Sequence, residues 1–410
     1  MNIKKSDKIL LVLAVFLLAA GLVFRIGFRG ATKAKRVNLV FTQLRESAWG
    51  EDGLNSLIEE YEKLHPEVKI RQEIRGYDEI RAISTDAAGE ETAGPDLIAM
   101  EGRYLAEFIK AKTFSSLDSY LHSETPLEEW VLPLVSSMDV LFYNIDILKT
   151  AGFDRPPRNR AEFLLYAQTV SGGKRGADKQ YGAALALGPA ENRGMYRDVF
   201  SWIWASGALL TREGVPDTGS KQVADTLAFL AQLNREGLLA PKSFDATGPQ
   251  RLDEFAAGKI AMMTGSVQDI ARVRDRMKEG SFGVTLIPGP ADYAGKPVFG
   301  LSVWYAGIRA GGKHPDEAWA FLLYLRENGV TIAEQIRAVP GSLPREGFIA
   351  PYIGSDPYYS KAWDMYEAAD LVQELTGFPK VRELETSVRE ELVKLFAAAL
   401  TTAQKRQGQP

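Results

Sequence analysis

Residues 137–157 read SMDVLFYNIDILKTAGFDRPP, and this stretch decides the fold class of the chain. Residues 140–143 are β-branched, apolar or aromatic, which is typical of a buried strand. Asn144 follows at a position suited to a helix N-cap, where its side chain accepts a backbone hydrogen bond. The short helix that it begins must end at Gly152, before two prolines that cannot continue it. The stretch therefore predicts a strand, a capped helix and a stop.

Strand and helix patterns alternate along the chain on both sides of this stretch. Short apolar or alternating runs predict strands, and apolar residues at helical spacing predict the helices between them. Strands are expected at 37–41, 68–70, 96–100, 182–187, 260–263, 283–287 and 303–308, and helices at 54–64, 223–233, 252–256, 316–325 and 388–400. This order indicates a parallel or mixed sheet covered by helices. Because the chain has neither a tandem repeat nor a low-complexity linker, we expect its domains to be interwoven.

The composition is that of a soluble globular protein with an acidic body. The chain has 410 residues, of which 45% are hydrophobic and 25% charged, so it is long enough for two ordinary domains. Residues 1–36 carry eight Lys and Arg against Asp7, a net charge of +7, which leaves −11 for the remaining 374 residues of a chain whose total is −4. An acidic body argues against a nucleic-acid partner.

An uncharged apolar run occupies residues 9–24 and follows a lysine-rich start. It is slightly short for a spanning helix of about twenty residues and longer than most signal-peptide cores. We interpret it as an export signal that is either cleaved or kept as an anchor, since Thr32-Lys33-Ala34 is a mediocre cleavage site. The flank after the run is more basic than the flank before it, which favours an alternative, an anchored protein that faces the cytoplasm.

Few residues are available for covalent or metal chemistry. The chain contains no cysteine, which excludes disulfides, thiolate catalysis and a lipid-modified N-terminal Cys. Its three histidines, His65, His122 and His314, lie far apart and form no metal-ligand spacing. The segment 300–304 lacks the second glycine of a nucleophile elbow. We therefore predict no enzyme activity, no metal and no cofactor.

The opening stretch also carries a resemblance. Its pattern YN-x-D-x-L-x-x-x-G-x-x-x-P-P, at 143–157, resembles the signature of the extracellular solute-binding proteins of ABC importers, and it is most similar to the carbohydrate-binding subgroup that includes maltose-binding protein. Six further segments look like landmarks of this family in the family order: PEVKI, GPDLI, FAAGKIAMMTGS, GVTLIPGP, KHPDEAWAFLLYL and AVPGSLP. Any one of them alone is weak, whereas six in order are specific.

The resemblance implies an α/β fold of the two-lobed periplasmic-binding-protein type, class II, with interwoven lobes and a hinge between them. Residues 1–36 would be the signal peptide or anchor. The first lobe would comprise 37–141 plus 298–345, and the second 142–297 plus 346–410. Residues 139–143 would then form the first strand of the hinge, and the helix after Asn144 would be the first of the second lobe.

The resemblance also implies a function. Such a protein captures a small hydrophilic solute outside the cytoplasm, with a sugar as the expected ligand, and delivers it to the permease subunits of an ABC importer. The mechanism is hinge closure around the ligand, without a covalent step. We expect a monomer that is periplasmic or extracytoplasmic, either soluble or tethered to the inner membrane by the apolar N-terminal segment.

Candidate ligand-binding residues fall into three groups. Sugars need aromatic rings against their CH faces and polar groups around their hydroxyls. Charged residues at strand ends are favoured because open α/β sheets gather ligands there. Thr264 and Ser266 are expected in a turn that opens a helix toward Val273. The full set is Arg45, Trp49, Glu101, Arg103, Asp139, Tyr196, Trp202, Thr264, Ser266, Trp304 and Arg345.

Three alternatives remain open at this stage. The same fold could bind a polyol phosphate, a peptide or another anion, and convergence of Arg45, Arg103, Arg193 and Arg197 would favour this. A glycosidase could use Glu101 and Asp139 as paired carboxylates. A membrane-anchored sensor ectodomain could use the fold without transport.

Overall fold

The structure, a computed structural model, describes residues 36–44, 49, 53–85, 94–121, 125–173, 176–189, 193–329, 331–332, 339–340, 355–372 and 374–407. Almost all of the expected signal or anchor segment lies outside these residues, as do the candidate site residues Arg45 and Arg345. Within the described ranges, no helix has the length and apolarity that crossing a bilayer requires.

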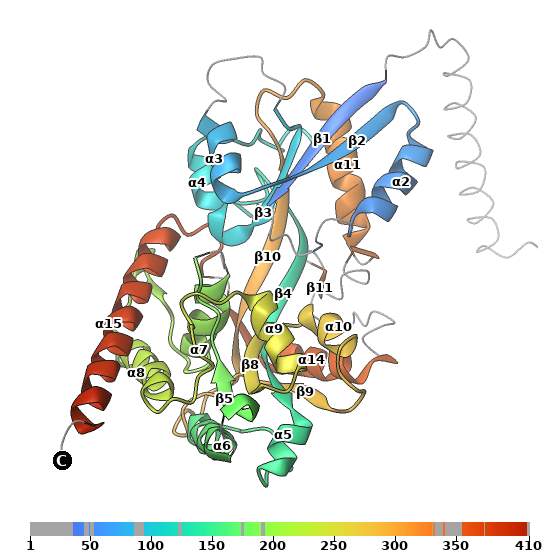
Figure 1. Ribbon diagram of the computed structural model, residues 1–410. Helices are drawn as coiled ribbons and strands as arrows, with labels where there is room; N and C mark the ends of the chain where they lie inside the picture. The colour runs from blue at the N-terminus through green and yellow to red at the C-terminus, as the bar shows by residue number, and fades with distance from the viewer. Residues whose placement is uncertain are drawn as a thin grey trace, which may run out of the picture.

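The chain folds into two lobes that share one curled, mixed sheet (Figure 1). Its strands follow the order β2-β1-β3-β10-β4-β8-β5, with β11 and β9 paired to β4 and β12 paired to β10. A small separate hairpin joins β6 to β7. The strands are β1 (Val37–Leu44), β2 (Val68–Arg75), β3 (Leu97–Glu101), β4 (Leu132–Asn144), β5 (Tyr181–Ala184), β6 (Thr211–Arg212), β7 (Val215–Pro216), β8 (Ile260–Ser266), β9 (Phe282–Thr285), β10 (Val298–Ile308), β11 (Val339–Pro340) and β12 (Asp370–Val372).

Helices cover the sheet in both lobes, as the strand-helix alternation predicts. The upper lobe of Figure 1 holds β1, β2 and β3 with α2, α3, α4 and α11, and the lower lobe holds the remaining helices, with α15 lying along α8. The helices are α2 (Asn55–Leu64), α3 (Tyr77–Thr85), α4 (Leu105–Lys110), α5 (Ile145–Thr150), α6 (Arg160–Gly173), α7 (Ser201–Trp204), α8 (Lys221–Arg235), α9 (Gly248–Ala256), α10 (Asp269–Arg274), α11 (Pro315–Glu327), α14 (Pro357–Ala368) and α15 (Val381–Gln407). Short helical segments are η2 (Gly102–Tyr104), η3 (Gly176–Asp178) and the π-helix η4 (Tyr196–Phe200).

Two long antiparallel strands, β4 and β10, run from one lobe to the other (Figure 1). Their register places Ser302 opposite Ser137, and a bulge follows at Trp304. In the upper lobe β10 also pairs with β3, and in the lower lobe β4 pairs with β8. The two crossing strands therefore join the two halves of the sheet and fix the position of every strand end near the lobe boundary.

The stretch 137–157 has the predicted local structure. Residues 137–144 belong to β4, and the side chain of Asn144 accepts a hydrogen bond from the backbone N–H of Ile147 at 3.0 Å. The helix α5 follows, and Gly152 after it has φ of +91°, a conformation that favours glycine. The strand, the cap and the stop are confirmed.

One local prediction differs from the structure. Thr264 and Ser266 do not open a helix, because β8 continues through Ser266, which pairs with Asp139 of β4. The helix α10 begins only at Asp269, whose carboxylate accepts the backbone N–H of Ser266 at 2.8 Å. Residues 196–200 form the π-helix η4, and α7 follows at 201–204.

Gly300 of β10 packs directly against the lower lobe, at the ring of Trp204. A Cβ atom at this position would lie 1.9 Å from the ring of Trp204 on α7, a distance that no real contact shows. Because both the strand and the ring are buried, we expect Gly300→Ala to lower the free energy of unfolding by about 2 kcal/mol. Urea denaturation followed by tryptophan fluorescence measures this change.

The matched control is Gly172→Ala near the end of α6, where an added Cβ meets nothing within 4 Å. Its unfolding midpoint should equal or slightly exceed that of the wild type, by at most about 1 kcal/mol, since Ala favours helix over Gly. Equal midpoints for the Gly300 variant and the wild type would show that Trp204 does not pack tightly against β10.

Candidate functional site

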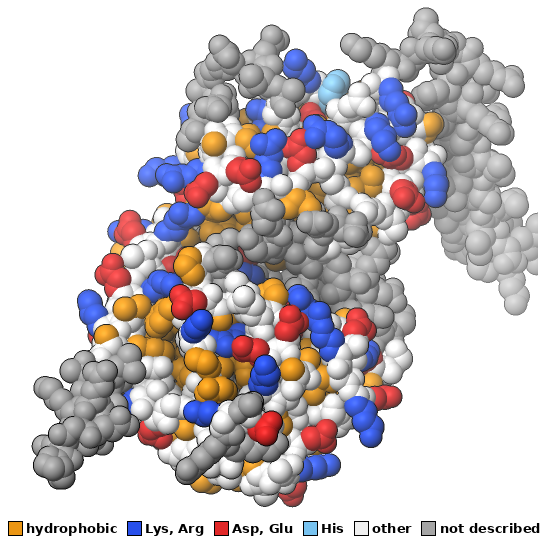
Figure 2. Space-filling view, viewed as in Figure 1, with side chains coloured by type: hydrophobic (Ala, Val, Ile, Leu, Met, Phe, Trp, Pro, Cys, Tyr) orange, Lys and Arg blue, Asp and Glu red, His pale blue; other side chains and the backbone are white. Residues whose placement is uncertain are grey.

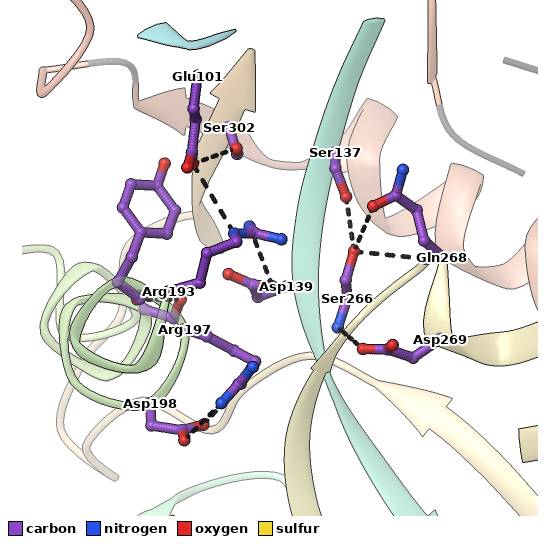
Figure 3. A network of polar contacts seen from close by, with 12 residues as sticks. Glu101, Ser137, Asp139, Arg193, Arg197, Asp198, Ser266, Gln268, Asp269 and Ser302 are labelled. Carbon is purple, nitrogen blue, oxygen red and sulfur yellow. Dashed lines mark hydrogen bonds and ion pairs between the residues drawn. The ribbon is translucent and has the colours of Figure 1, made fainter. Parts of the chain in front are cut away.

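Polar side chains from both lobes meet where β4 and β10 cross between them (Figure 3). We call this group the interlobe network and define it as the contacts made by Glu101, Ser137, Asp139, Arg193, Arg197, Asp198, Ser266, Gln268, Asp269 and Ser302. Glu101 is the last residue of β3, Asp139 lies on β4 and Ser302 lies on β10. Arg193 lies in the turn that leads into η4.

Glu101 is fully buried and both of its carboxylate oxygens accept hydrogen bonds. The Ser302 hydroxyl donates to Oε1, and Arg103 Nε donates to Oε2 at 2.9 Å. Burial opposes ionisation, yet the charges of Arg103 and Arg193, together with the Ser302 hydrogen bond, hold the pKa of Glu101 below its usual value. Glu101 is therefore ionised, and each of its oxygens has a hydrogen-bond donor.

Arg103 is buried as well, and it connects the network to the C-terminal helix. Its Nη1 donates to Oε1 of Glu385 on α15 at 2.6 Å. The backbone N–H of Gly377 donates to the carbonyl of Gly102 at 2.9 Å, so the segment before α15 also contacts the upper lobe. Arg103, predicted as a ligand contact, is thus bound on two sides by carboxylates.

Arg193 reaches between Glu101 and Asp139 (Figure 3). Its Nε lies 3.8 Å from Oε1 of Glu101, and its Nη2 lies 3.7 Å from Oδ1 of Asp139. These separations give electrostatic attraction but are too long for hydrogen bonds. Burial raises the pKa of the Asp139 carboxyl, although Arg193 and Arg197 oppose the shift.

Hydroxyl groups occupy the other part of the interlobe network. Ser137 and Ser266 share a hydrogen bond of 2.7 Å between β4 and β8, and the backbone N–H of Gln268 approaches the Ser266 hydroxyl at 3.4 Å. Thr264, on the same strand as Ser266, accepts the indole N–H of Trp202 at 3.1 Å. Ser266, a predicted site residue, therefore contacts Ser137, Gln268 and Asp269, and its strand β8 pairs with Asp139 of β4.

Arg197 and Asp198 form the lower part of the network. Arg197 Nη2 lies 3.1 Å from Oδ2 of Asp198, which also accepts the backbone N–H of Ala186 at 2.6 Å. Tyr196, the first residue of η4, is buried, and burial raises its pKa well above the ordinary value. The guanidinium groups of Arg103 and Arg193 both lie 5.9 Å from its ring centroid.

The predicted tryptophans are packed against protein. Trp49 and Trp304 meet edge to face at 5.8 Å, and Trp202 contacts Phe163 at 5.0 Å. All three side chains are at most 3% exposed. The structure does not test whether any of them contacts a ligand, so that role stays a prediction.

Sequence reasoning missed the polar members that local pattern does not mark. Arg193 was considered only as part of an anion site, and Ser137, Gln268 and Ser302 were not proposed as site residues. A usable signal was present for the two serines, because Ser137 and Ser302 interrupt otherwise apolar strands at the crossing. Buried polar residues in such strands need partners, and facing serines are one solution.

The interlobe network yields a prediction for Glu101. Glu101→Gln leaves Arg103 and Arg193 beside a neutral amide in a buried position, which should lower the free energy of unfolding by roughly 3 kcal/mol near neutral pH. Since the pKa of Glu101 is held below its usual 4.5, the charge stabilises the fold above that pH, and the stabilisation is lost as the pH falls below it. Urea denaturation at a series of pH values should show the difference from wild type shrinking as the pH falls below the usual range of a glutamate.

Glu162→Gln is the control for this variant. Glu162 forms an ion pair with Arg155 at 2.6 Å on the outer side of α6, and the Arg155 hydrogen bond lowers its pKa to about 2. Because solvent screens this pair, we expect a loss below about 1 kcal/mol despite the low pKa. Equal losses in the two variants would refute the structural role assigned to Glu101.

The sequence is similar to a known family of bacterial proteins and to individual members of it. The family model described as "Bacterial extracellular solute-binding protein" matches residues 47–332. A relative from Deinococcus radiodurans, described as a probable ABC transporter-binding protein, is 27% identical over 203 residues, covering 47% of this chain and 46% of the relative. The sn-glycerol-3-phosphate-binding periplasmic protein UgpB of Salmonella typhimurium is 26% identical over 180 residues, covering 42% of this chain and 39% of that protein. The chain thus spans less than half the length of each of these two relatives.

The fold itself matches solved structures over nearly its full length. The maltose/maltodextrin-binding domain MalE from Bdellovibrio bacteriovorus, solved with maltotriose bound, aligns with a TM-score of 0.69 at 18% sequence identity. The alignment covers 91% of this chain and all of that one. At this level of identity the likeness shows the two-lobed fold, which confirms the fold class predicted from the sequence.

Proposed function

The chain belongs to the bacterial extracellular solute-binding proteins, and from this premise we propose that it captures a small, neutral, hydrophilic solute, best fitted by a sugar, and delivers it to the permease of an ABC importer. The single observation that carries the choice of ligand is the charge pairing of the interlobe network. The relatives described above support the transport role. We propose that the protein acts as a monomer, with the apolar N-terminal segment serving as export signal or anchor.

Three arginines at the lobe boundary, Arg103, Arg193 and Arg197, lie beside carboxylates. The ion pairs of these three guanidinium groups involve four carboxylates, which belong to Glu101, Asp139, Asp198 and Glu385. An anionic ligand would have to compete with these carboxylates and would be repelled by the excess negative charge. Sugar hydroxyls, which donate and accept without net charge, suit such a site.

This pairing argues against the polyol phosphate alternative that the likeness to UgpB raises. A phosphate group binds well where arginines converge with free donors and no competing carboxylate. Figure 2 likewise shows charges of both signs interspersed over the visible face of both lobes. We therefore propose a neutral sugar in place of sn-glycerol-3-phosphate.

We propose that ligand capture occurs by hinge closure about β4 and β10. The network draws Glu101 from a strand of the upper lobe and Arg193 from the lower lobe, so the two sides meet only when the lobes are close together. A ligand held between them would favour that arrangement in proportion to its extra contacts. The lobe boundaries expected from the resemblance, near 141, 298 and 345, form part of this proposal.

The glycosidase alternative finds one supporting observation and one against it. Asp139 has a raised pKa and Glu101 a lowered one, which is the division that an acid and an ionised partner would need. However, Glu101 is buried, and its two oxygens accept hydrogen bonds from Ser302 and Arg103, which favours a structural role over that of a nucleophile. We propose binding without turnover.

A thermal-shift panel tests this proposal. Maltotriose, maltose and glucose represent neutral sugars, and sn-glycerol 3-phosphate and a tripeptide represent the alternatives. A ligand at 100 times its dissociation constant stabilises the protein by about 2.7 kcal/mol, which raises the melting temperature by several degrees. We expect a shift from at least one neutral sugar and none from the phosphate.

A shift from sn-glycerol 3-phosphate or the tripeptide alone would overturn the sugar assignment. Release of nitrophenol from a nitrophenyl glycoside would overturn the absence of turnover. The buffer should contain about 0.15 M salt, so that weak surface binding of the anion is screened.

A further inference from the structure

Asp139 and Arg193 are incompletely hydrogen-bonded in a buried position. Among the described residues, neither carboxylate oxygen of Asp139 has a hydrogen-bond partner, and neither do Nε and Nη2 of Arg193. The Asp139 side chain is 1% exposed and that of Arg193 is 13% exposed. Buried polar atoms in folded proteins are nearly always hydrogen-bonded, because an unmade bond costs the full desolvation of the group. Four such atoms side by side indicate a missing partner.

The neighbouring groups cannot supply the missing hydrogen bonds. The Ser201 hydroxyl lies near Asp139 and lowers its pKa, but it donates its hydrogen bond to the carbonyl of Tyr196 at 3.0 Å. Both oxygens of Glu101 accept from Arg103 and Ser302. The hydroxyls of Ser137 and Ser266 share one hydrogen bond, and the Ser266 hydroxyl also lies 3.5 Å from Oε1 of Gln268. The partner must therefore come from outside this set of side chains.

The pair presents an acceptor beside a donor. The Asp139 carboxylate accepts hydrogen bonds only and the Arg193 guanidinium donates only, and the two stand 3.7 Å apart. A pair of adjacent hydroxyls matches this arrangement, since one hydroxyl donates to the carboxylate and the other accepts from the guanidinium. Bonds to charged groups of this kind are stronger than neutral ones.

Glu101 and Arg103 attract or flank the guanidinium of Arg193, and their own polar atoms are bound to protein groups. Glu101 is fixed by Ser302 and Arg103, and Arg103 is fixed in turn by Glu385 of α15. Glu101 then attracts Arg193 Nε across 3.8 Å. Glu101 and Arg103 are therefore positioning residues, whereas Asp139 and Arg193 have polar atoms that can still form hydrogen bonds with a ligand.

We propose that Asp139 and Arg193 form a specificity-determining pair that binds two adjacent hydroxyl groups of the solute. This inference rests on the proposed function and names the ligand feature that the site recognises. A solute without one of the two hydroxyls would leave a buried charged group unpaired, and should bind about 10- to 100-fold more weakly.

The first test needs no ligand. Asp139→Asn keeps the shape of the side chain but removes a charge whose oxygens have no hydrogen bonds, so the unliganded variant should unfold at a urea midpoint equal to or above that of wild type. Arg155→Gln, in the segment before α6, serves as the control for loss of an ordinary surface ion pair, here with Glu162. A loss of stability in Asp139→Asn as large as that in Glu101→Gln would overturn the proposal, because Asp139 would then be a structural ion-pair partner.

The second test measures binding by calorimetry with maltotriose and with glucose beside 2-deoxyglucose and 3-deoxyglucose. For any of these sugars that binds wild type, Asp139→Asn and Arg193→Gln should each bind about 10- to 100-fold more weakly, and Arg155→Gln should bind as wild type does. Unchanged affinity in both site variants would overturn the pair while leaving the sugar-binding function intact. Failure of every sugar to bind wild type would overturn the proposed function, and the stability comparison would still decide whether Asp139 is a structural residue.

Discussion

The antiparallel pairing of β4 with β10 is the constraint on which the rest of the structure depends. These strands join the two halves of one sheet, and each pairs with a different neighbour above and below the crossing. Because strand register is fixed residue by residue, the pairing sets Ser302 opposite Ser137 and Asp139 opposite Ser266. The polar groups on β4, β8 and β10 are therefore placed by backbone hydrogen bonds, and Arg193 reaches them from the turn before η4.

Burial of so many charges at this crossing demands compensation. Removing an ion from water costs several kcal/mol, and a buried pair repays that cost only when further hydrogen bonds satisfy its remaining atoms. Glu101 meets this condition through Ser302 and Arg103, whereas Asp139 does not. Within one cluster of charged residues, Glu101 therefore has a structural role, whereas the carboxylate of Asp139 is available to a solute in the proposed site. The contrast also explains why the pKa of one carboxyl is lowered and that of the other raised.

Much of the fold could be predicted from the sequence because its signals are local. The cap at Asn144 and the stop at Gly152 depend on neighbours within a few residues, and both are confirmed. The extension of β8 through Ser266 was missed because it depends on pairing with β4, more than a hundred residues away. Arg193 was missed as the bridging residue for the same reason, since its partners lie 54 and 92 positions earlier in the chain. Composition and spacing show which charges exist, but only the topology shows which of them meet.

The distances within the site also bear on how the lobes would move. Contacts on the side of α15 are short hydrogen bonds. Arg103 Nη1 donates to Glu385 Oε1 at 2.6 Å, and the backbone N–H of Gly377 donates to the carbonyl of Gly102 at 2.9 Å. Contacts made by Arg193 are loose, at 3.7 and 3.8 Å, and include no hydrogen bond to Asp139 or Glu101. In the proposed hinge, separating the loose contacts costs little, whereas the tight ones would stay together near the pivot. A binding protein needs such an asymmetry, because a solute can shift the equilibrium toward closure only by the contacts it adds, and strong contacts already present between the lobes would close them without it.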